Sequence, residues 1–434
     1  MEINVGLVGY GTVGKGMLEV LINNGNVIRK RSGFDIVVRA VADMNIDKNK
    51  DALLSTIPHI TRDVNQLLDD ENIDIIVELI GGINDARDII HKAIVRKKHI
   101  VTANKALLAM HGEEIFKLAE EYDVIVGFEG SVGGGIPIIR VLKEDLAVNN
   151  VKEIYGIVNG TANYILTKME KEGKEFYDVL GEAQDMGYAE SDPAFDVEGI
   201  DSAHKISIIS SIAFCTHTPF HKIYTEGITN IKQIDIAFAK RLNCKIKLLA
   251  IAKKYKEDIE VRVHPTIIPD RYILSKVDDV YNAFYIRCGK VDRTIHYGRG
   301  AGGSPTGSAV VADIVSIARD IKSCSSKRVP LLGFRKKFDN YYHIKDINEI
   351  YSAFYLRFTV VDKPKVMSVI SGILGDHNIS IISALQRGEL SSNNMMPLVF
   401  MTHEVLAKNI YDAVNIIDQL DIIKDKTVII RVEQ

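Results

Sequence analysis

A glycine turn between a strand and a helix near the N-terminus constrains the fold of this chain most. Ile3 to Val8 is a short apolar run, and Gly9-Tyr10-Gly11-Thr12-Val13-Gly14 follows it and opens a helical pattern through Leu21. A G-x-G-x-x-G spacing after a strand and before a helix is typical of the first unit of a dinucleotide-binding sheet. The plain alternative is a glycine turn in an α/β domain that holds no ligand.

Strand-like and helical runs keep alternating beyond this turn. Further strands are expected at 36–42, 73–79, 99–102 and 124–128, and helical runs include 86–96 and 113–122. This alternation predicts an α/β domain with a Rossmann-type, doubly wound parallel sheet over residues 1–135. A later helix near 305–322 is expected to return and complete that domain.

The rest of the chain changes character twice. Residues 136–304 predict an α+β domain for substrate binding and dimerisation, with strands at 151–158, 260–265 and 281–288. Residues 323–350 are interpreted as a linker. Residues 351–434 predict the β-α-β-β-α-β order of a ferredoxin-like domain, with these elements: strand 355–361, helix 365–376, strands 381–386 and 396–402, helix 405–419 and strand 427–432.

Composition limits the partners and the compartment. The net charge of −3 over 434 residues favours neither nucleic acid nor an anionic membrane. The four cysteines are scattered without a C-x-x-C pair, which indicates reduced thiols. The first residues lack the layout of a signal peptide, and no apolar run approaches the roughly 20 residues that span a bilayer. We therefore expect a cytoplasmic protein that acts on a small molecule.

The second expected strand ends at Asp43, where an acid commonly bonds the adenosine ribose. Such an acid favours NAD, because it would repel a 2′-phosphate. Arg39, Lys48 and Lys50 lie close enough in sequence to offset that repulsion, so NADP stays open.

An acid-rich loop precedes a lysine between Ala183 and Lys205. Five carboxylates stand in its last sixteen residues, at Glu190, Asp192, Asp196, Glu198 and Asp201. Helical spacing after Gly199 places Asp201 and Lys205 one turn apart on one helix face. Such a cluster can hold a small zwitterion or orient a proton donor. The bland alternative is an exposed helix cap with a solvated ion pair.

These motifs together resemble the homoserine dehydrogenase family. The resemblance rests on the glycine turn, on ELIGG at Glu78–Gly82, on VTANKALLA at Val101–Ala109 and on the acid loop. Residues 351–434 resemble an ACT regulatory domain. The resemblance implies NAD(P)H-dependent interconversion of L-aspartate 4-semialdehyde and L-homoserine, in threonine, methionine and isoleucine biosynthesis.

The family's site residues carry over position by position. The resemblance implies that Lys205 donates a proton, that Lys105 polarises the carbonyl and touches the cofactor, and that Asp201 orients Lys205. It implies substrate contacts at Glu190, Asp196, Gly160, Thr161 and Tyr188. It implies cofactor contacts at Gly9, Tyr10, Gly11, Thr12, Val13, Gly14, Asp43, Lys105 and Gly303.

A glycine-rich run at Glu129–Pro137 matches the family's monovalent-cation site. The resemblance implies a structural sodium ion held by Glu129 and by the carbonyls of Val132, Gly134 and Ile136. A glycine turn can aim carbonyl oxygens at a hard cation. A plain hinge between domains is the alternative.

The ACT-like segment departs from the family pattern at one turn. Lys365 stands where the family usually has glycine after the proline, which argues against an effector approaching the backbone there. An amino-acid effector and a role in assembly both stay open, and a homodimer or higher homo-oligomer is expected. A non-catalytic nucleotide-binding sensor with an ACT domain is the alternative function. A phosphorylating semialdehyde dehydrogenase would need a nucleophilic cysteine, and no cysteine lies in a suitable loop.

Overall fold

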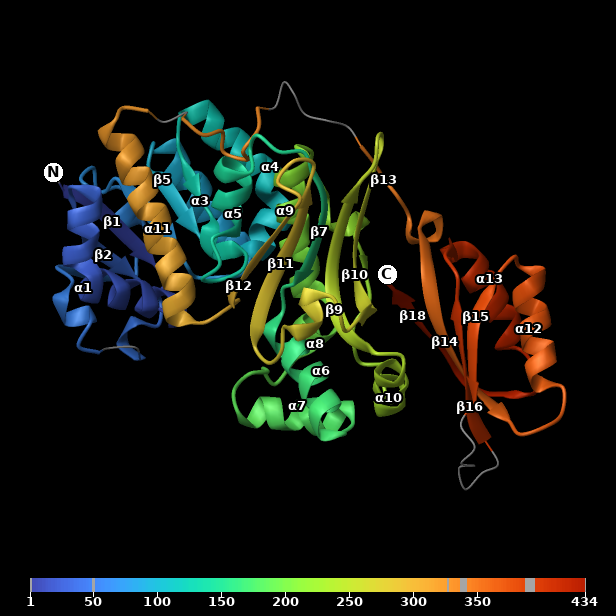
Figure 1. The fold of residues 1–434 in the computed structure, drawn as a ribbon. Coiled ribbons are helices and arrows are strands. Elements are labelled where there is room, and N and C mark those ends of the chain that lie inside the picture. Colours follow the sequence, from blue (N-terminus) through green and yellow to red (C-terminus); the bar gives the residue numbers. More distant parts are fainter. Residues whose placement is uncertain (1, 49–50, 326–327, 336–341, 387–394, 434) are drawn as a thin grey trace. The chain divides into compact units, whose positions relative to one another are not determined.

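The computed structural model describes residues 2–48, 51–325, 328–335, 342–386 and 395–433 (Figure 1). The chain forms two compact units, each built from separated stretches. The first contains Met1–Gly160, Ala203–His221 and Val280–Tyr342, and the second contains Thr161–Ser202, Lys222–Asp279 and His343–Gln434.

The first unit contains a six-stranded parallel sheet in the order β3-β2-β1-β4-β5-β6. This is the strand order of a Rossmann sheet, so the predicted fold class is confirmed. The strands are β1 Glu2–Val8, β2 Asp35–Ala42, β3 His59–Thr61, β4 Ile75–Glu78, β5 His99–Thr102 and β6 Val126–Gly127. The accompanying helices are α1 Thr12–Ser32, α2 Asn65–Leu68, α3 Asn84–Val95, α4 Lys105–Tyr122 and α5 Ile138–Arg140.

Helix α11, Gly303–Lys322, joins this sheet from far along the sequence (Figure 1). Its apolar face, which includes Val310, Ile314 and Ile317, lies in the same buried cluster as β1 and β4. Glycines allow α1 and α11 to touch along their backbones. A Cβ atom on Gly16 would lie 2.2 Å from the carbonyl oxygen of Gly303, so a larger residue at Gly16 would separate the helices.

The first unit also holds three antiparallel strands, with β11 between β7 and β12. They are β7 Val151–Ile157, β11 Tyr281–Cys288 and β12 Arg293–Arg299. Helix α9, Ile200–Phe214, belongs to this unit from Ala203 onward, and the residues from Asp201 to Ser210 are all buried. A helix buried on every side needs the nearly continuous apolar run seen after Lys205.

The second unit is built around a long antiparallel pair, β9 Cys244–Lys254 and β10 Asp258–Pro269. The short strand β8, Tyr224–Thr225, runs parallel to β10. The helices of this part are α6 Gly160–Glu172, α7 Phe176–Asp185, α8 Ala194–Val197 and α10 Gln233–Arg241.

The last segment of the second unit has the expected β-α-β-β-α-β order. Its sheet runs β18-β14-β16-β15, and β18 pairs in parallel with β10 at Thr266–Arg431 and Ile267–Val432. The elements are β14 Tyr351–Val361, α12 Val366–Asp376, β15 Ile381–Gln386, β16 Met395–Thr402, β17 Val405–Leu406, α13 Ala407–Ile417 and β18 Ile423–Val432. Both helices cover a buried apolar cluster that includes Phe354, Phe358 and Phe400.

Several local predictions were incomplete. The sequence patterns did not indicate β3, β9 or β12, and the strand expected at 124–128 is only Val126–Gly127. The helix expected from Lys365 starts at Val366, because Lys365 takes a left-handed φ of +73°. In the expected linker, residues 326–327 and 336–341 lie outside the described residues, whereas β13, His343–Ile344, pairs with β10. Among the described residues, no helix is long and apolar enough to cross a membrane.

Candidate active site

The glycine turn after β1 has the geometry that a dinucleotide needs. Gly9 has a φ of +101°, and a Cβ on it would lie 2.6 Å from the backbone carbon of Leu79. A Cβ on Gly14 would lie 2.4 Å from the carbonyl oxygen of Gly9, so both positions require glycine. Gly11 is exposed with open space where its Cβ would be, and it begins α1 without a side-chain cap. The amides at this helix start therefore stay available to a pyrophosphate.

Asp43 supports this turn from the end of β2. Its two carboxylate oxygens accept the backbone amides of Tyr10 at 2.7 Å and Asn45 at 2.6 Å. Thr12 is exposed and Val13 is half-buried at the start of the helix. Arg39 pairs with Asp70 at 3.1 Å, whereas the side chain of Lys48 and the whole of Lys50 lie outside what the structure describes. The structure thus places Asp43 beside the glycine turn and commits Arg39 to another carboxylate.

Tyr10 lies inside the turn rather than on its surface. Its ring is fully buried, and its hydroxyl donates to Asp51 at 2.7 Å. Burial, and then the nearby Asp51 carboxylate, raise the pKa of Tyr10. Asp51 also pairs with Lys15 of α1 at 3.2 Å. This role of Asp51 could not be predicted from the sequence, because its segment carries no periodic pattern.

Lys105 is the first residue of α4 and directly follows the carboxyl end of β5. Asn104 fixes this helix start, since its side chain accepts the Leu107 amide at 3.1 Å and donates to the Gly82 carbonyl at 2.6 Å. The backbone amide of Asn104 in turn donates to the Thr102 hydroxyl at 3.0 Å. Lys105 is half-buried. Lys105 therefore lies at an anchored helix start, on the edge of the sheet where such folds bind ligands.

Glu78 is a buried carboxylate whose role could not be inferred from the sequence. It accepts the Thr102 hydroxyl at 2.7 Å and the amides of Ile80 at 2.9 Å and Gly81 at 3.3 Å. Burial raises its pKa despite these bonds. Glu78 thereby joins the carboxyl end of β4 to the end of β5, three residues before Lys105.

Lys205 is buried, with only 6% of its surface exposed. Its ammonium donates to the carbonyl oxygen of Val158, which follows β7, at 2.6 Å. Asp201 lies one turn earlier on α9 and is 3% exposed. The bland alternative of an exposed, solvated pair is therefore wrong. A lysine buried this deeply needs polar partners, and it can exchange a proton with a bound group away from bulk water.

Gly160 lies two residues after Val158 and begins α6. A Cβ on Gly160 would lie 2.9 Å from the carbonyl oxygen of Val280, so the backbones approach closely there. Gly303 begins α11, and a Cβ on it would lie 2.8 Å from the carbonyl oxygen of Thr12. The structure thus brings Gly303 against the glycine turn.

The acid loop belongs to the second unit. Gly187 turns the chain with a φ of +72°, and the hydroxyl of Thr161 donates to the carbonyl of Tyr188 at 2.8 Å. The ring of Tyr188 is 5.1 Å from that of Tyr164, which agrees with a packing role beside any ligand contact. Glu190 is exposed and Asp196 is half-buried in α8. The structure therefore brings Thr161 and Tyr188 together at the base of the loop.

Glu129 lies in a buried turn of the first unit. Its carboxylate accepts the amides of Ile139 and Arg140, both at 2.8 Å. Burial, and then the charge of Asp313, raise the pKa of Glu129 to about 7. The backbone turns sharply at Gly134, with a φ of +55°.

The other expected cation ligands lie in the same turn. Val132 is buried, and the carbonyl of Ile136 already accepts the Ile138 amide at 2.8 Å. No group of three or more His, Cys, Asp or Glu side chains within the described ranges could hold a metal ion. One buried carboxylate with several backbone carbonyls suits a monovalent cation better than zinc.

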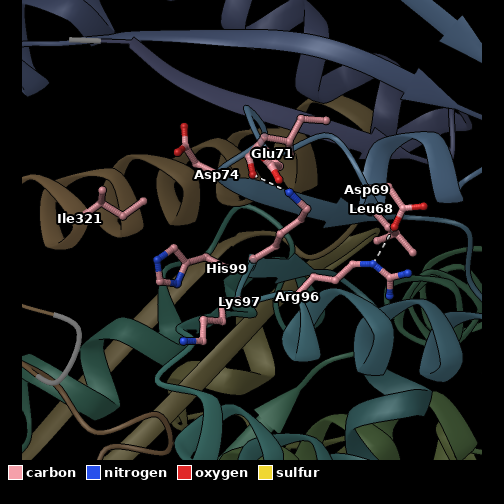
Figure 2. Close-up of a pocket in the computed structure, with 10 residues that line it drawn as sticks. Leu68, Asp69, Glu71, Asp74, Arg96, Lys97, His99 and Ile321 are labelled. Atoms are coloured by element: carbon pink, nitrogen blue, oxygen red, sulfur yellow. Dashed lines mark hydrogen bonds and ion pairs between the residues drawn. The ribbon is translucent and has the colours of Figure 1, made fainter.

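A separate pocket of about 510 Å³ opens at the amino ends of β4 and β5 (Figure 2). Figure 2 shows Asp74 and His99 at these strand ends, with Arg96 directed to Asp69 at 2.8 Å. The Lys98 ammonium donates to the carbonyls of Asp70 and Ile73 at 2.7 and 2.9 Å. These bonds occupy Arg96, Asp69 and Lys98, and the pocket lies at the sheet edge opposite the glycine turn.

Family models match almost the whole chain. "Homoserine dehydrogenase, NAD binding domain" matches residues 9–129, "Homoserine dehydrogenase" matches residues 137–315, and "ACT domain" matches residues 354–421. The chain is 43% identical to a homoserine dehydrogenase of Neisseria gonorrhoeae, covering 99% of this chain and 98% of that protein. It is 42% identical to one of Pseudomonas aeruginosa, covering 100% and 99%.

Solved structures agree with these matches. A homoserine dehydrogenase from Thiobacillus denitrificans superposes with a TM-score of 0.95 at 43% identity, covering 100% of this chain and 99% of that one. One from S. aureus gives a TM-score of 0.77 at 31% identity, with coverage of 100% and 99%. A hyperthermophilic archaeal homoserine dehydrogenase in complex with NADPH gives 0.62 at 27% identity, covering 74% and 98%.

Proposed function

The chain belongs to the homoserine dehydrogenase family, and from this premise we propose how its residues carry out the NAD(P)H-dependent interconversion of L-aspartate 4-semialdehyde and L-homoserine. The observation that carries the proposal is the buried Lys205 ammonium, held at 2.6 Å from the carbonyl of Val158. A donor held in place before the reaction loses little entropy when it acts.

The two lysines divide the work on the substrate carbonyl. A nicotinamide cofactor, when bound, would supply the hydride for the carbonyl carbon. Lys205 gives a proton to the carbonyl oxygen, and it accepts that proton back from the homoserine hydroxyl in the reverse direction. Lys105 stabilises the negative charge that develops on this oxygen and contacts the cofactor, and Asp201 orients Lys205 from one helical turn away.

The acid loop recognises the amino-acid end of the substrate. Glu190 and Asp196 accept hydrogen bonds from its ammonium group, and Gly160, Thr161 and Tyr188 contact its backbone. The 2.8 Å hydrogen bond from the Thr161 hydroxyl to the Tyr188 carbonyl holds these two residues side by side, which supports a common contact with the substrate. Charge-assisted bonds to an ammonium select against substrates that lack it.

The cofactor binds along the glycine turn. Gly9, Tyr10, Gly11, Thr12, Val13 and Gly14 hold the pyrophosphate, Asp43 contacts the ribose, and Gly303 lies at the nicotinamide end. Asp43 beside the turn favours NADH, whereas the archaeal relative was solved with NADPH. Initial rates of semialdehyde-dependent oxidation, measured side by side with NADH and NADPH, decide the preference. Cofactor binding without turnover would instead support the non-catalytic sensor.

A structural sodium ion is proposed at Glu129 with the carbonyls of Val132, Gly134 and Ile136. Burial and the charge of Asp313 raise the pKa of Glu129 because they disfavour its ionised form, and a bound cation would offset that cost. The ion would stabilise the turn and would not touch the reacting atoms.

Self-association is proposed through the exposed side of β12. Ile295 and Tyr297 of this outer strand are exposed, and Tyr297 stacks on Tyr281 with ring centroids 5.1 Å apart. Exposed apolar residues on an edge strand favour pairing with a second copy. Light scattering on the purified protein would show a homodimer, and a monomer would contradict it.

The remaining expectations concern organisation and regulation. We propose a dinucleotide-binding domain at 1–135, completed by a helix at 305–322, and a substrate-binding and dimerisation domain at 136–304. A linker at 323–350 and an ACT domain at 351–434 follow. We place the enzyme in the cytoplasm, in threonine, methionine and isoleucine biosynthesis. The left-handed Lys365 supports the view that an amino-acid effector does not approach that turn, so threonine inhibition, if rates reveal it, acts elsewhere in the ACT domain.

A further inference from the structure

The end of the acid loop rests directly on a short segment that follows β8. The amide of Ile228 donates to the carbonyl of Val197 at 2.8 Å. A Cβ on Gly227 would lie 2.4 Å from that same carbonyl oxygen and 2.5 Å from Glu198 Cα. Only glycine allows this approach, so residues 226–228 support Val197, next to Asp196, from outside the loop.

This segment is held in turn by the C-terminal domain. Glu226 pairs with Arg431 of β18 at 3.1 Å, and the Tyr224 hydroxyl donates to the same Glu226 oxygen at 2.9 Å. The guanidinium also donates to the Tyr411 hydroxyl of α13 and lies 4.7 Å from the centre of the Tyr224 ring. One arginine therefore joins two elements of the C-terminal domain to the segment beneath the acid loop.

The two side chains of the Glu226–Arg431 pair differ in their exposure to solvent. The Arg431 side chain is 1% exposed, whereas the Glu226 side chain is 32% exposed. Arg431 cannot turn to water, but Glu226 can do so once its partner is removed. Loss of Arg431 would therefore loosen the Glu226 side chain without leaving a buried carboxylate unpaired, while the Glu226 amide keeps its 2.8 Å bond to the Val263 carbonyl.

We propose that Arg431 is a positioning residue for the substrate, because it holds the acid loop in place through Glu226 and Val197. The C-terminal domain thereby contributes to the affinity for the amino-acid end of the substrate. The proposal rests on the proposed role of Asp196 as an acceptor for the substrate ammonium. It assigns Arg431 no contact with the reacting atoms.

Steady-state kinetics on the full-length enzyme test this link. In Arg431→Met, we expect the KM for L-aspartate 4-semialdehyde to rise about fivefold or more, a typical size for coupling between sites. The KM for the nicotinamide cofactor should stay within about twofold, because the glycine turn is untouched. Arg431→Lys should restore part of the affinity, because it returns the buried charge.

The pair itself is tested by a second variant. Glu226→Gln should also raise the semialdehyde KM. The double variant should have a KM no higher than that of Arg431→Met, because both changes break the same contact between Glu226 and Arg431. Glu226→Gln also keeps the test open if Arg431→Met does not fold.

Arg357→Met is the matched control for a merely structural effect. Arg357 of β14 forms another buried pair, with Asp235 of α10 at 2.6 Å. This control should lower the unfolding midpoint and leave the semialdehyde KM unchanged. A raised semialdehyde KM in Arg357→Met equal to that in Arg431→Met would overturn a specific route through Glu226.

Asp196→Asn separates this proposal from the proposed function. If Asp196→Asn raises the semialdehyde KM and the Arg431 and Glu226 variants do not, the positioning role is overturned. If Asp196→Asn leaves the KM unchanged, the assigned role of the acid loop fails, and the route through Val197 is overturned with it.

Discussion

The ammonium of Lys205 donates a 2.6 Å hydrogen bond to the carbonyl oxygen of Val158, from a position on α9 that is almost closed to solvent. The carbonyl belongs to the backbone at the end of β7, two residues before Gly160. The proposed proton donor and the proposed substrate contact are therefore joined through one short stretch of main chain.

Asp201→Asn should lower kcat by roughly ten- to a hundredfold, because the orienting carboxylate is removed while the buried lysine stays. Steady-state rates with saturating cofactor measure this effect. Asp178→Asn, at an exposed acid of α7, is the control and should behave as the unaltered enzyme. Unchanged turnover in Asp201→Asn would remove the residue from the mechanism.

Glu190→Gln should raise the semialdehyde KM by about tenfold and leave the cofactor KM unchanged, because one charge-assisted bond to the ammonium is lost. Homoserine oxidation should show the same change in the reverse direction. A change in cofactor KM alone would contradict a role in substrate binding.

Gly9→Ala and Gly11→Ala should fail in different ways. Gly9→Ala should lower the free energy of unfolding by about 1–3 kcal/mol or more, because Gly9 has a φ of +101° and no room for a Cβ. Gly11→Ala should fold normally, because its Cβ meets nothing within 4 Å, yet raise the cofactor KM by blocking the pyrophosphate. Thermal unfolding and cofactor titration on both variants check this contrast, and equal stability of the two would contradict it.

Sodium should stabilise the enzyme more at pH 8 than at pH 5.5. Folding raises the pKa of Glu129 from 4.5 to about 7. Its contribution to stability is therefore present below pH 4.5 and is lost as pH rises through about 7. The proposed sodium ion would bind the ionised form and offset that loss.

Unfolding midpoints in sodium chloride and in choline chloride of equal ionic strength measure the sodium effect. Glu129→Gln should abolish the difference between the two salts at pH 8. An equal sodium effect at both pH values would argue against an ion at Glu129.

The larger architecture could be predicted because it depends on periodicity and on glycine. The turn at Gly9 to Gly14 follows a strand and opens a helix, and this context identified the sheet. The β-α-β-β-α-β order could likewise be read from alternating apolar runs. The three-residue β3 is too short for such a signal, and β12 runs into glycines at positions 298, 300, 302 and 303, which weaken a strand pattern.

Several site features could not be predicted because they depend on tertiary contacts. Glu78 and Asp51 act through hydrogen bonds to residues 24 and 41 positions away in sequence. One partner of Lys205 is the main-chain carbonyl of Val158, which any residue type at position 158 would supply. By contrast, the departure at Lys365 was visible in the sequence, and its left-handed backbone explains why glycine suits that turn.

The most direct test of Lys205 as the proton donor is to measure both the turnover and the cofactor affinity of Lys205→Met. The variant should keep its circular dichroism spectrum and its affinity for NADH or NADPH, measured by fluorescence titration. Its kcat for L-aspartate 4-semialdehyde reduction should fall by roughly a hundredfold to ten-thousandfold. A folded Lys205→Met enzyme that turns over at the unaltered rate would contradict Lys205 as the proton donor.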